Sequence, residues 1–465
     1  MNMINVRRLT VMTFLGAGML SGISAQVSPL QVDTLKEMKI PTQWDLQSCI
    51  DYAKEQNITI RKNRITAAST QIDVKTAKAV MFPSLSFSTS QQVVNRPYQE
   101  TSSRVSGSEI ISSNSKTSYN GNYGLNASWT LYNGNKRLKT IQQEKLNNQM
   151  AELDVATSEN NIQESIAQVY IQILYAAESV KVNENTLQVS IAQRDRGQEL
   201  LNAGSIAKSD LAQLEAQVST DRYQLVTAQA TLEDYKLQLK QLLELDGENE
   251  MNIYLPALSD ENVLAPLPTK RDVYISALSL RPEIEASKLN VEASELGINI
   301  AKSSYFPTIS LSAGIGTNHT SGSDFTFGEQ VKNGWNNSIG LSVSVPIFNN
   351  RQTKSAVQKA KLQYETSMLS LLDEQKALYK TIESLWLDAN SAQQRYAAAN
   401  EKLKSTQISY ELISEQFNLG MKNTVELLTE KNNLLQAQQE QLQAKYMAIL
   451  NTQLLKFYQG DQLAL

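Results

Sequence analysis

Residues 201–211 read LNAGSIAKSDL, and residues 417–427 read FNLGMKNTVEL. Each stretch places a glycine inside a long helical pattern, and the numbers of the two glycines differ by 420 − 204 = 216. Two further pairs of segments recur in order: YGLNASWTLYN (123–133) with IGLSVSVPIFN (339–349), and MFPSLSFS (81–88) with YFPTISLS (305–312), the last at an offset of 306 − 82 = 224. Two copies of one unit therefore fill the chain after its first residues, with a small insertion or deletion between them.

The N-terminus has the pattern of a secretory signal peptide. Arg7 and Arg8 precede an apolar run from Leu9 to Leu20, and small residues follow as far as Ala25, so we expect cleavage after residue 25. No later stretch reaches the roughly 20 apolar residues that a membrane-spanning helix needs. The sequence predicts an exported protein with a signal peptide at 1–25 and no helical anchor.

Composition excludes several classes of site. Cys49 and His319 are the only cysteine and the only histidine, so sites that need two cysteines or two histidines are excluded. The net charge of −4 and the absence of a GxxxxGK loop argue against nucleic-acid and phosphate binding. We predict no catalytic residues, no cofactor and no metal. Cys49 is expected to be a small buried hydrophobe, and His319 a solvated loop residue.

Two helical hairpins are expected, at about 135–245 and 351–458, with turns at Gly204 and Gly420. A proline-free helix from Lys136 to Glu199 would be about 95 Å long. Leucine and other apolar residues repeat every seven positions in the return helices, at Leu211, Val218, Leu225, Leu232 and Leu239 and again at Leu428, Leu435, Leu442 and Ile449, and Asp221 breaks the companion positions. Such a period predicts coiled-coil packing. A structural or adhesive coiled-coil envelope protein accounts for these helices equally well.

Four strands are expected, at about 84–95, 119–132, 308–318 and 335–348, because apolar and polar residues alternate there. The polar positions are Ser, Asn, Thr and Gly without charge, which is typical of a membrane barrel whose other face meets a water-filled lumen. We expect Leu125, Trp129, Leu341 and Val343 to face lipid. The segments at about 96–118 and 318–334 are expected to be extracellular loops.

The number of strands predicts an oligomer. Four strands cannot close a barrel, and open strand edges are not tolerated in lipid. Several copies of the chain must therefore share one barrel. The count alone leaves two, three or more copies open.

The chain resembles the TolC-like outer-membrane efflux proteins. The resemblance rests on the two glycine turns, on Phe82-Pro83 and Phe306-Pro307 before the strands, and on Arg281-Pro282 in the second copy. It implies a mainly α fold with a membrane β-barrel, in which a homotrimer shares 12 strands and a long periplasmic α-helical barrel. The implied units are a first repeat at 26–245, an equatorial linker at 246–270 and a second repeat at 271–465.

The family resemblance also implies a function. The protein would be the passive outer-membrane exit duct of a tripartite efflux pump or type I secretion system, reaching into the periplasm. Its partners would be outer-membrane lipid, a periplasmic adaptor (membrane fusion) protein and an inner-membrane transporter of the RND or ABC type that supplies the energy. The residues expected to touch the adaptor are Gly204, Ser205, Ile206, Gly420, Met421 and Lys422.

The resemblance also points to a pore constriction. Several family members carry two aspartates, three positions apart, after the second glycine turn; Glu426 and Thr429 occupy these positions here, and Asp210 is the first-repeat equivalent of Glu426. With Lys422, these residues are the constriction candidates, since rings of like charge select ions at a narrow pore. The alternative is that each acid only stabilises the first turn of its helix, by about 0.3–1 kcal/mol.

Overall fold

The computed structural model describes residues 41–98, 102–106, 109–113, 116–246, 251–256, 263–321, 323 and 325–463. The chain divides into residues 1–42 and 43–465, and the second unit contains all the helices and strands described below. The expected signal peptide, 1–25, lies outside the described residues.

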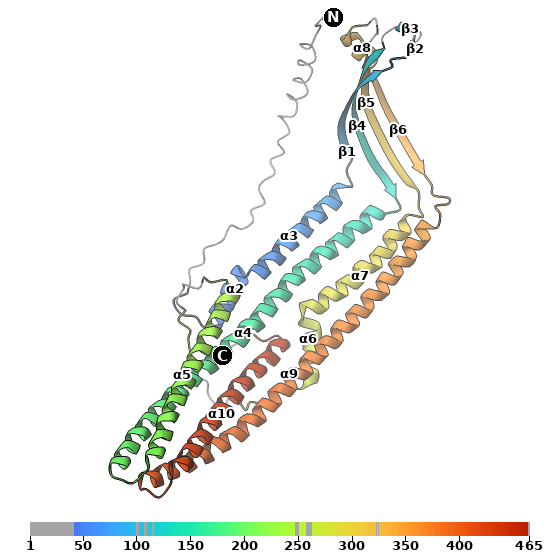
Figure 1. The fold of residues 1–465 in the computed structure, drawn as a ribbon. Helices are drawn as coiled ribbons and strands as arrows, with labels where there is room; N and C mark the ends of the chain where they lie inside the picture. The colour runs from blue at the N-terminus through green and yellow to red at the C-terminus, as the bar shows by residue number, and fades with distance from the viewer. Residues whose placement is uncertain are drawn as a thin grey trace, which may run out of the picture. The chain divides into compact units, whose positions relative to one another are not determined.

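The first repeat contains four helices and two long strands (Figure 1): α2 (Leu46–Gln56), α3 (Ile58–Ala79), β1 (Ser84–Asn95), β4 (Thr117–Asn133), α4 (Lys136–Asn202) and α5 (Lys208–Leu242). The second repeat has the same order: α6 (Lys270–Leu280), α7 (Pro282–Ser303), β5 (Thr308–Thr320), β6 (Asn336–Ser344), α9 (Gln352–Asn418) and α10 (Thr424–Gln459). Between the long strands lie β2 (Ser102–Ser106) and β3 (Glu109–Ser113) in the first repeat and α8 (Phe327–Asn333) in the second. These three elements occupy segments where the sequence suggested only loops.

The duplication is visible in the element boundaries. Helices α4 and α9 each have 67 residues, and their first residues, Lys136 and Gln352, have the same offset as the two glycines. Helices α3 and α7 each have 22 residues. Their first residues, Ile58 and Pro282, differ by 282 − 58 = 224, which is also the offset between Phe82-Pro83 and Phe306-Pro307. The change in offset therefore arises between the start of the strands and the start of the long helices. It corresponds to the different inserts in the two hairpins, a small β-hairpin in one and α8 in the other.

The four long strands form one antiparallel sheet in the order β1-β4-β5-β6. Phe87 pairs with Leu125, and Leu125 pairs with Ile315; directly opposed residues of antiparallel strands share one face of the sheet. The other face carries small polar residues and glycine, as in the row Ser86, Asn126, Gly314 and Ser338. The register therefore places the apolar residues of the four strands on one face, with the exception of Val94, which pairs with Ser118 on the other.

The alternation ends earlier in β4 and β6 than the sequence suggested. A bulge in β4 shifts the pairing from Thr130 with Ser310 to Tyr132 with Ile309, so Tyr132 occupies the position expected for Leu131. Strand β6 ends at Ser344 rather than near 348. Pro346 follows, and a proline has no backbone N–H to continue a ladder.

The expectation that His319 is a solvated loop residue is wrong. His319 is only 8% exposed and belongs to β5. Its ring stacks on that of Tyr123 at 5.8 Å and meets that of Phe327 edge-on at 5.0 Å. Gly121 lies directly opposite His319, and a side chain at Gly121 would collide with the imidazole ring. This close cross-strand fit could not be read from the local sequence.

The helices next to the sheet repeat its order. Helix α3 packs against α4, α4 against α7, and α7 against α9, so α3 and α9 lie at the two edges as β1 and β6 do in the sheet (Figure 1). Two left-handed residues join each strand to its long helix: Gly134 and Asn135 (φ 67° and 62°) in the first repeat, and Asn350 and Arg351 (φ 50° and 66°) in the second. These paired turns set the direction of the helices below the sheet.

The largest hydrophobic core lies midway along the helices, around Tyr170 and Tyr396, which are 1% and 0% exposed. Parts of the expected linker cross it: the Tyr170 hydroxyl donates to the Tyr254 carbonyl at 2.6 Å, and Gln393 Nε2 donates to the Ala265 carbonyl at 2.8 Å. Cys49 is fully buried in this core, and burial raises the pKa of its thiol to about 12. The linker segments thus bind to α4 and α9.

Candidate functional site

The two glycine turns end α4 and α9 in the same way. Gly204 and Gly420 have φ of 75° and 74°, the left-handed region that favours glycine. In the first turn, Gly204 N–H donates to the Leu201 carbonyl at 2.9 Å and Ser205 N–H to the Leu200 carbonyl at 2.8 Å. The second turn has the same two bonds, from Gly420 to Phe417 at 2.9 Å and from Met421 to Gln416 at 2.8 Å. Both are Schellman motifs, which satisfy the last carbonyls of a helix.

The two turns lie close together in the folded chain. A small hydrophobic cluster just behind them draws on all four hairpin helices, with Leu200, Leu214, Phe417 and Leu427 buried. Of the residues expected to touch an adaptor, Ile206 is half-buried against this cluster. Ser205 is exposed, and Met421 is 70% exposed. The free surface of the turns is thus formed by backbone, Ser205, Met421 and Leu419, which is 75% exposed.

The two acids of the expected constriction both contact the start of their own helix. Asp210 Oδ2 accepts the Ala207 N–H at 3.0 Å. Glu426 Oε2 accepts the Asn423 N–H at 3.2 Å, and Asn423 Oδ1 accepts the Glu426 N–H at 2.9 Å, which is a capping box. Thr429 is exposed, and its hydroxyl donates to the Val425 carbonyl at 2.8 Å. The first-turn role of both acids is therefore present within one chain.

Lys422 pairs with Glu426 and not with Asp210, at 2.6 Å between Nζ and Oε1. This ammonium, followed by the Asn423 N–H, holds the pKa of Glu426 below its usual value. Because the pKa is lowered on folding, the contribution of Glu426 to stability is complete above the ordinary glutamate value and disappears as the pH falls through the lower folded value. Glu426 is consequently ionised at neutral pH.

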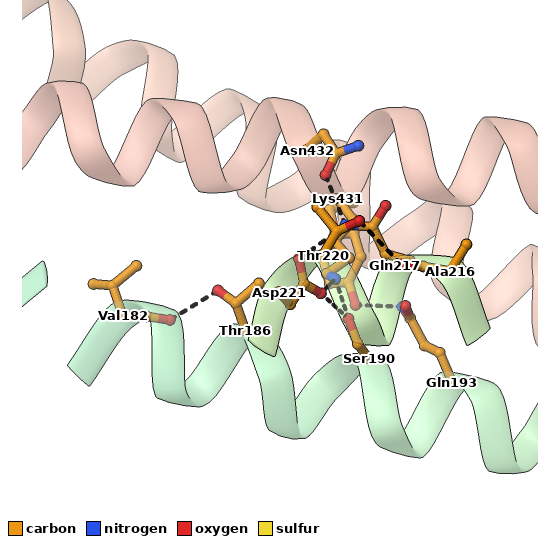
Figure 2. A network of polar contacts seen from close by, with 11 residues as sticks. Val182, Thr186, Ser190, Gln193, Ala216, Gln217, Thr220, Asp221, Lys431 and Asn432 are labelled. Carbon is orange, nitrogen blue, oxygen red and sulfur yellow. Dashed lines mark hydrogen bonds and ion pairs between the residues drawn. The ribbon is translucent and has the colours of Figure 1, made fainter. Parts of the chain in front are cut away.

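A buried ion pair lies farther from the turns, and Figure 2 shows Lys431 of α10 reaching between α4 and α5. Its ammonium contacts the carboxylate of Asp221 on α5 and the hydroxyl of Ser190 on α4, and that hydroxyl also donates to Asp221. The side chains of Lys431 and Asp221 are 4% and 1% exposed. One buried contact thus joins three helices from both repeats.

Further polar contacts surround the pair. Gln217 Nε2 donates to Asp221 Oδ1 at 2.8 Å and to Asn432 Oδ1 at 3.4 Å. Burial lowers the pKa of Lys431, and Asp221 opposes that shift. The hairpins are also joined by Ser179 Oγ to Gln439 Oε1 at 3.0 Å and by Gln193 Nε2 to the Tyr410 hydroxyl at 2.8 Å. We name these contacts, with Ser190, Asp221 and Lys431, the polar seam.

Sequence reasoning missed the polar seam. Asp221 stood out only as a break in an apolar pattern, and Lys431, three positions after Leu428, is a charge among heptad leucines. One acidic and one basic residue, each among the apolar heptad positions of its own helix, could have suggested a buried ion pair. Ser190 gave no such signal. The pairing depends on how α5 and α10 are placed against each other.

Two absences bear on the chemistry of the described part of the chain. Its side chains include no group of three or more His, Cys, Asp or Glu that could hold a metal ion. Among the helices described, none is long and apolar enough to cross a bilayer.

Comparison with known proteins gives a consistent result. The family model described as "Outer membrane efflux protein" matches residues 49–244 and 273–460. The outer membrane efflux protein BepC of Brucella suis is 24% identical over 294 residues, 63% of this chain and 61% of BepC. The outer membrane protein TolC of Escherichia coli is 24% identical over 294 residues, 61% of this chain and 58% of TolC. The chain thus spans about three fifths of the length of these relatives.

The fold is also that of solved structures. The structure of CusC matches with a TM-score of 0.76 and 18% identity, covering 92% of this chain and 96% of that chain. VceC from Vibrio cholerae matches with a TM-score of 0.74 and 16% identity, covering 90% of this chain and 97% of that chain. The tandem repeat and the paired hairpins therefore belong to a known architecture.

The second turn provides a test of the left-handed glycine. Gly420→Val should destabilise the turn by about 1–2 kcal/mol, because a β-branched residue is strained at this φ. Hydrogen exchange of the amides at 415–424 should then be faster by roughly 5–30-fold. Met421→Val, a change at the neighbouring exposed residue, is the matched control. Equal protection in the two variants would show that the glycine conformation does not hold the turn.

The buried pair can be tested by removing one partner and by replacing both. Asp221→Ala should destabilise the contact between the hairpins by about 3–5 kcal/mol, since it leaves the Lys431 ammonium buried without a partner. Asp221→Leu combined with Lys431→Met should recover most of this loss. The measurement is the free energy of opening of α5 and α10 from hydrogen exchange. Glu233→Ala, which removes the exposed pair with Lys236, should change it by less than about 1 kcal/mol, and a similar effect of Asp221→Ala would contradict the assignment.

Proposed function

The chain belongs to the outer membrane efflux protein family, whose members include outer-membrane channels, and we propose that three copies form one passive exit duct for efflux or type I secretion. The duct lies in the outer membrane and extends into the periplasm. It has no catalytic chemistry and needs no cofactor of its own. A periplasmic adaptor protein would join it to an inner-membrane transporter of the RND or ABC type, which would supply the energy.

The observation that supports the trimer most strongly is the pair of open edges on one chain. Strands β1 and β6 each have a neighbour on one side only within the described sheet. Backbone N–H and C=O groups along such an edge cannot remain unpaired in lipid. Pairing β6 of one chain with β1 of the next satisfies them, and three chains of four strands give a barrel of 12.

The helices below the sheet carry a matching signal. Helix α3 exposes Ile58, Ile65 and Ile72, seven positions apart, at 48%, 58% and 40%, and α9 exposes Leu362 and Leu369 at 62% and 67%. These two helices lie at the same edges as β1 and β6. Apolar residues at heptad spacing are typical of a coiled-coil contact. We infer that α3 of one copy packs against α9 of the next.

The two faces of the sheet carry side chains suited to different surroundings, one apolar and one aqueous. Leu125, Trp129, Leu341 and Val343 lie on the apolar face, and each is at least 39% exposed in the single chain. We propose that this face meets outer-membrane lipid and that the Ser, Asn and Gly face lines the lumen. A coiled-coil envelope protein, the alternative for the helices, would not need this one-sided sheet.

At the other end of the molecule, the turns at Gly204, Ser205 and Ile206 and at Gly420, Met421 and Lys422 would meet the adaptor. Asp210 and Glu426, with Thr429 and Lys422 beside them, would line the narrowest part of the periplasmic tunnel. The capping contacts of both acids are compatible with this, because a capping carboxylate keeps its charge. Three copies would bring six carboxylates close together.

Cross-linking tests the trimer. Ile65→Cys with Leu369→Cys should give, after treatment with a short thiol cross-linker, covalent trimers as the largest species in a denaturing gel. Cys49 does not interfere, because its side chain is fully buried and out of reach of the cross-linker, and burial also raises the pKa of its thiol. Either cysteine alone should give no covalent trimer. Ile65→Cys with Leu412→Cys, also on α9 and exposed, is the position control, and ladders beyond three or equal trimer yield from this pair would refute the proposed packing.

The constriction is tested by planar-bilayer recording. Asp210→Asn with Glu426→Gln should lower the preference for cations and any block by multivalent cations, because the ring of negative charge is lost. Asp210→Glu with Glu426→Asp keeps the charge and should retain the selectivity. If the neutral variant keeps the selectivity and block of the unmodified protein, the acids act only as first-turn residues.

A further inference from the structure

Helix α8 lies on the apolar side of the sheet. The Thr317 hydroxyl of β5 donates to the Val331 carbonyl of α8 at 2.7 Å, and the rings of His319 and Phe327 are 5.0 Å apart. Thr317 and His319 continue the alternate row that contains Leu311 and Ile315, so their side chains leave the sheet on the apolar face. Both contacts therefore hold α8 against the apolar face and away from the polar one.

The helix has a defined local structure. Thr326 and Glu329 form a capping box in which Glu329 Oε2 accepts the Thr326 N–H at 2.8 Å. Gln330 Oε1 accepts the Thr320 N–H at 2.8 Å, which ties α8 to the end of β5. Beneath it, the ring of His319 also contacts the ring of Tyr119 at 5.2 Å. The segment is thus an ordered element with aromatic support.

Large aromatic side chains around α8 remain exposed. Phe325, Phe327 and Trp335 are 44%, 46% and 57% exposed. Trp335 directly precedes β6, in the alternate row that continues with Asn337, Ile339 and Leu341. The charged residues of α8, Glu329 and Lys332, are exposed as well. Aromatic rings beside charged and amide side chains are typical of elements that lie at a membrane interface.

The position along the strand fits the boundary of a bilayer. Ile309 lies at the helix end of β5 and Thr317 at α8. The strand between them is about 27 Å long, which is roughly 20 Å across a membrane at a tilt near 40°. The apolar band of an outer-membrane barrel is about 25 Å tall. If the band begins near exposed Phe306, α8 lies at its far boundary.

We propose that α8, with Phe325, Phe327 and Trp335, is an interfacial anchor that rests on the outer leaflet, outside the barrel wall and not over its mouth. This surface contacts lipid at the boundary between headgroups and acyl chains, because it continues the apolar face of the sheet at the outer end of that face. This inference rests on the proposed direction of that face toward lipid. It assigns α8 with Phe325 and Trp335 to the membrane surface and leaves the polar face of the sheet open to solvent.

Quenching of tryptophan fluorescence by lipids tests the anchor. The full-length protein is reconstituted in phospholipid vesicles that carry a nitroxide either near the headgroup or deep in the acyl chain. Trp335→Phe should remove a lipid-quenchable part of the fluorescence, and the shallow nitroxide should quench that part more strongly than the deep one. Trp129→Phe, on the apolar face, reports on the lipid-facing sheet in the same vesicles. Both changes keep an aromatic ring at a partly exposed position, and Trp129→Phe removes the hydrogen bond from Trp129 Nε1 to the Met81 carbonyl, so circular dichroism of each variant checks that the fold is kept.

A face control uses the neighbouring residue. Asn336→Trp in the Trp335→Phe background places the ring on the polar face, and its fluorescence should be quenched by iodide in water but not by nitroxide lipid. Lipid quenching from Trp129 without lipid quenching from Trp335 overturns the anchor alone. No lipid quenching from either overturns the proposed direction of the apolar face.

Discussion

The unpaired backbone along β1 and β6 is the constraint on which the rest of the structure depends. A strand edge in lipid has no water to satisfy its N–H and C=O groups, so a chain with four strands is incomplete by itself. The helices reproduce the same edges, since α3-α4-α7-α9 follows the order β1-β4-β5-β6. In the proposed trimer, the exposed isoleucines of α3 and leucines of α9 are contact residues between neighbouring chains. One physical requirement accounts for the sheet and for the helices below it.

The inner half of the molecule is held in a different way. The two hairpins share a small apolar cluster near their turns, and beyond it they meet through the polar seam around Asp221 and Lys431. A buried ion pair gives little net stability, because desolvation offsets most of the attraction. Removing either partner strands a charge, so the pair favours the arrangement of α5 and α10 in which Asp221 and Lys431 meet.

The two hairpin inserts show how a duplicated unit diverges. The repeats agree in helix length and in their Schellman turns, yet one hairpin carries β2 and β3 where the other carries α8. Both inserts lie at the end of the sheet that is farthest from the helices (Figure 1). Divergence is tolerated there because neither the closure of the sheet nor the packing of the helices depends on it.

The sequence by itself determined the duplication, the helices, the one-sided strands and the turns at Gly204 and Gly420, because each is a local or periodic property of the chain. From these followed the outer-membrane class of the fold. Only the tertiary structure decided the features that need distant segments to meet. The burial of His319 depends on Gly121 across the sheet, the bulge at Leu131 on the register with β5, and the Lys431–Asp221 pair on contacts between residues 431 − 221 = 210 positions apart. Periodicity fixes which face of an element is apolar, but it contains no information on which residue of another element lies opposite.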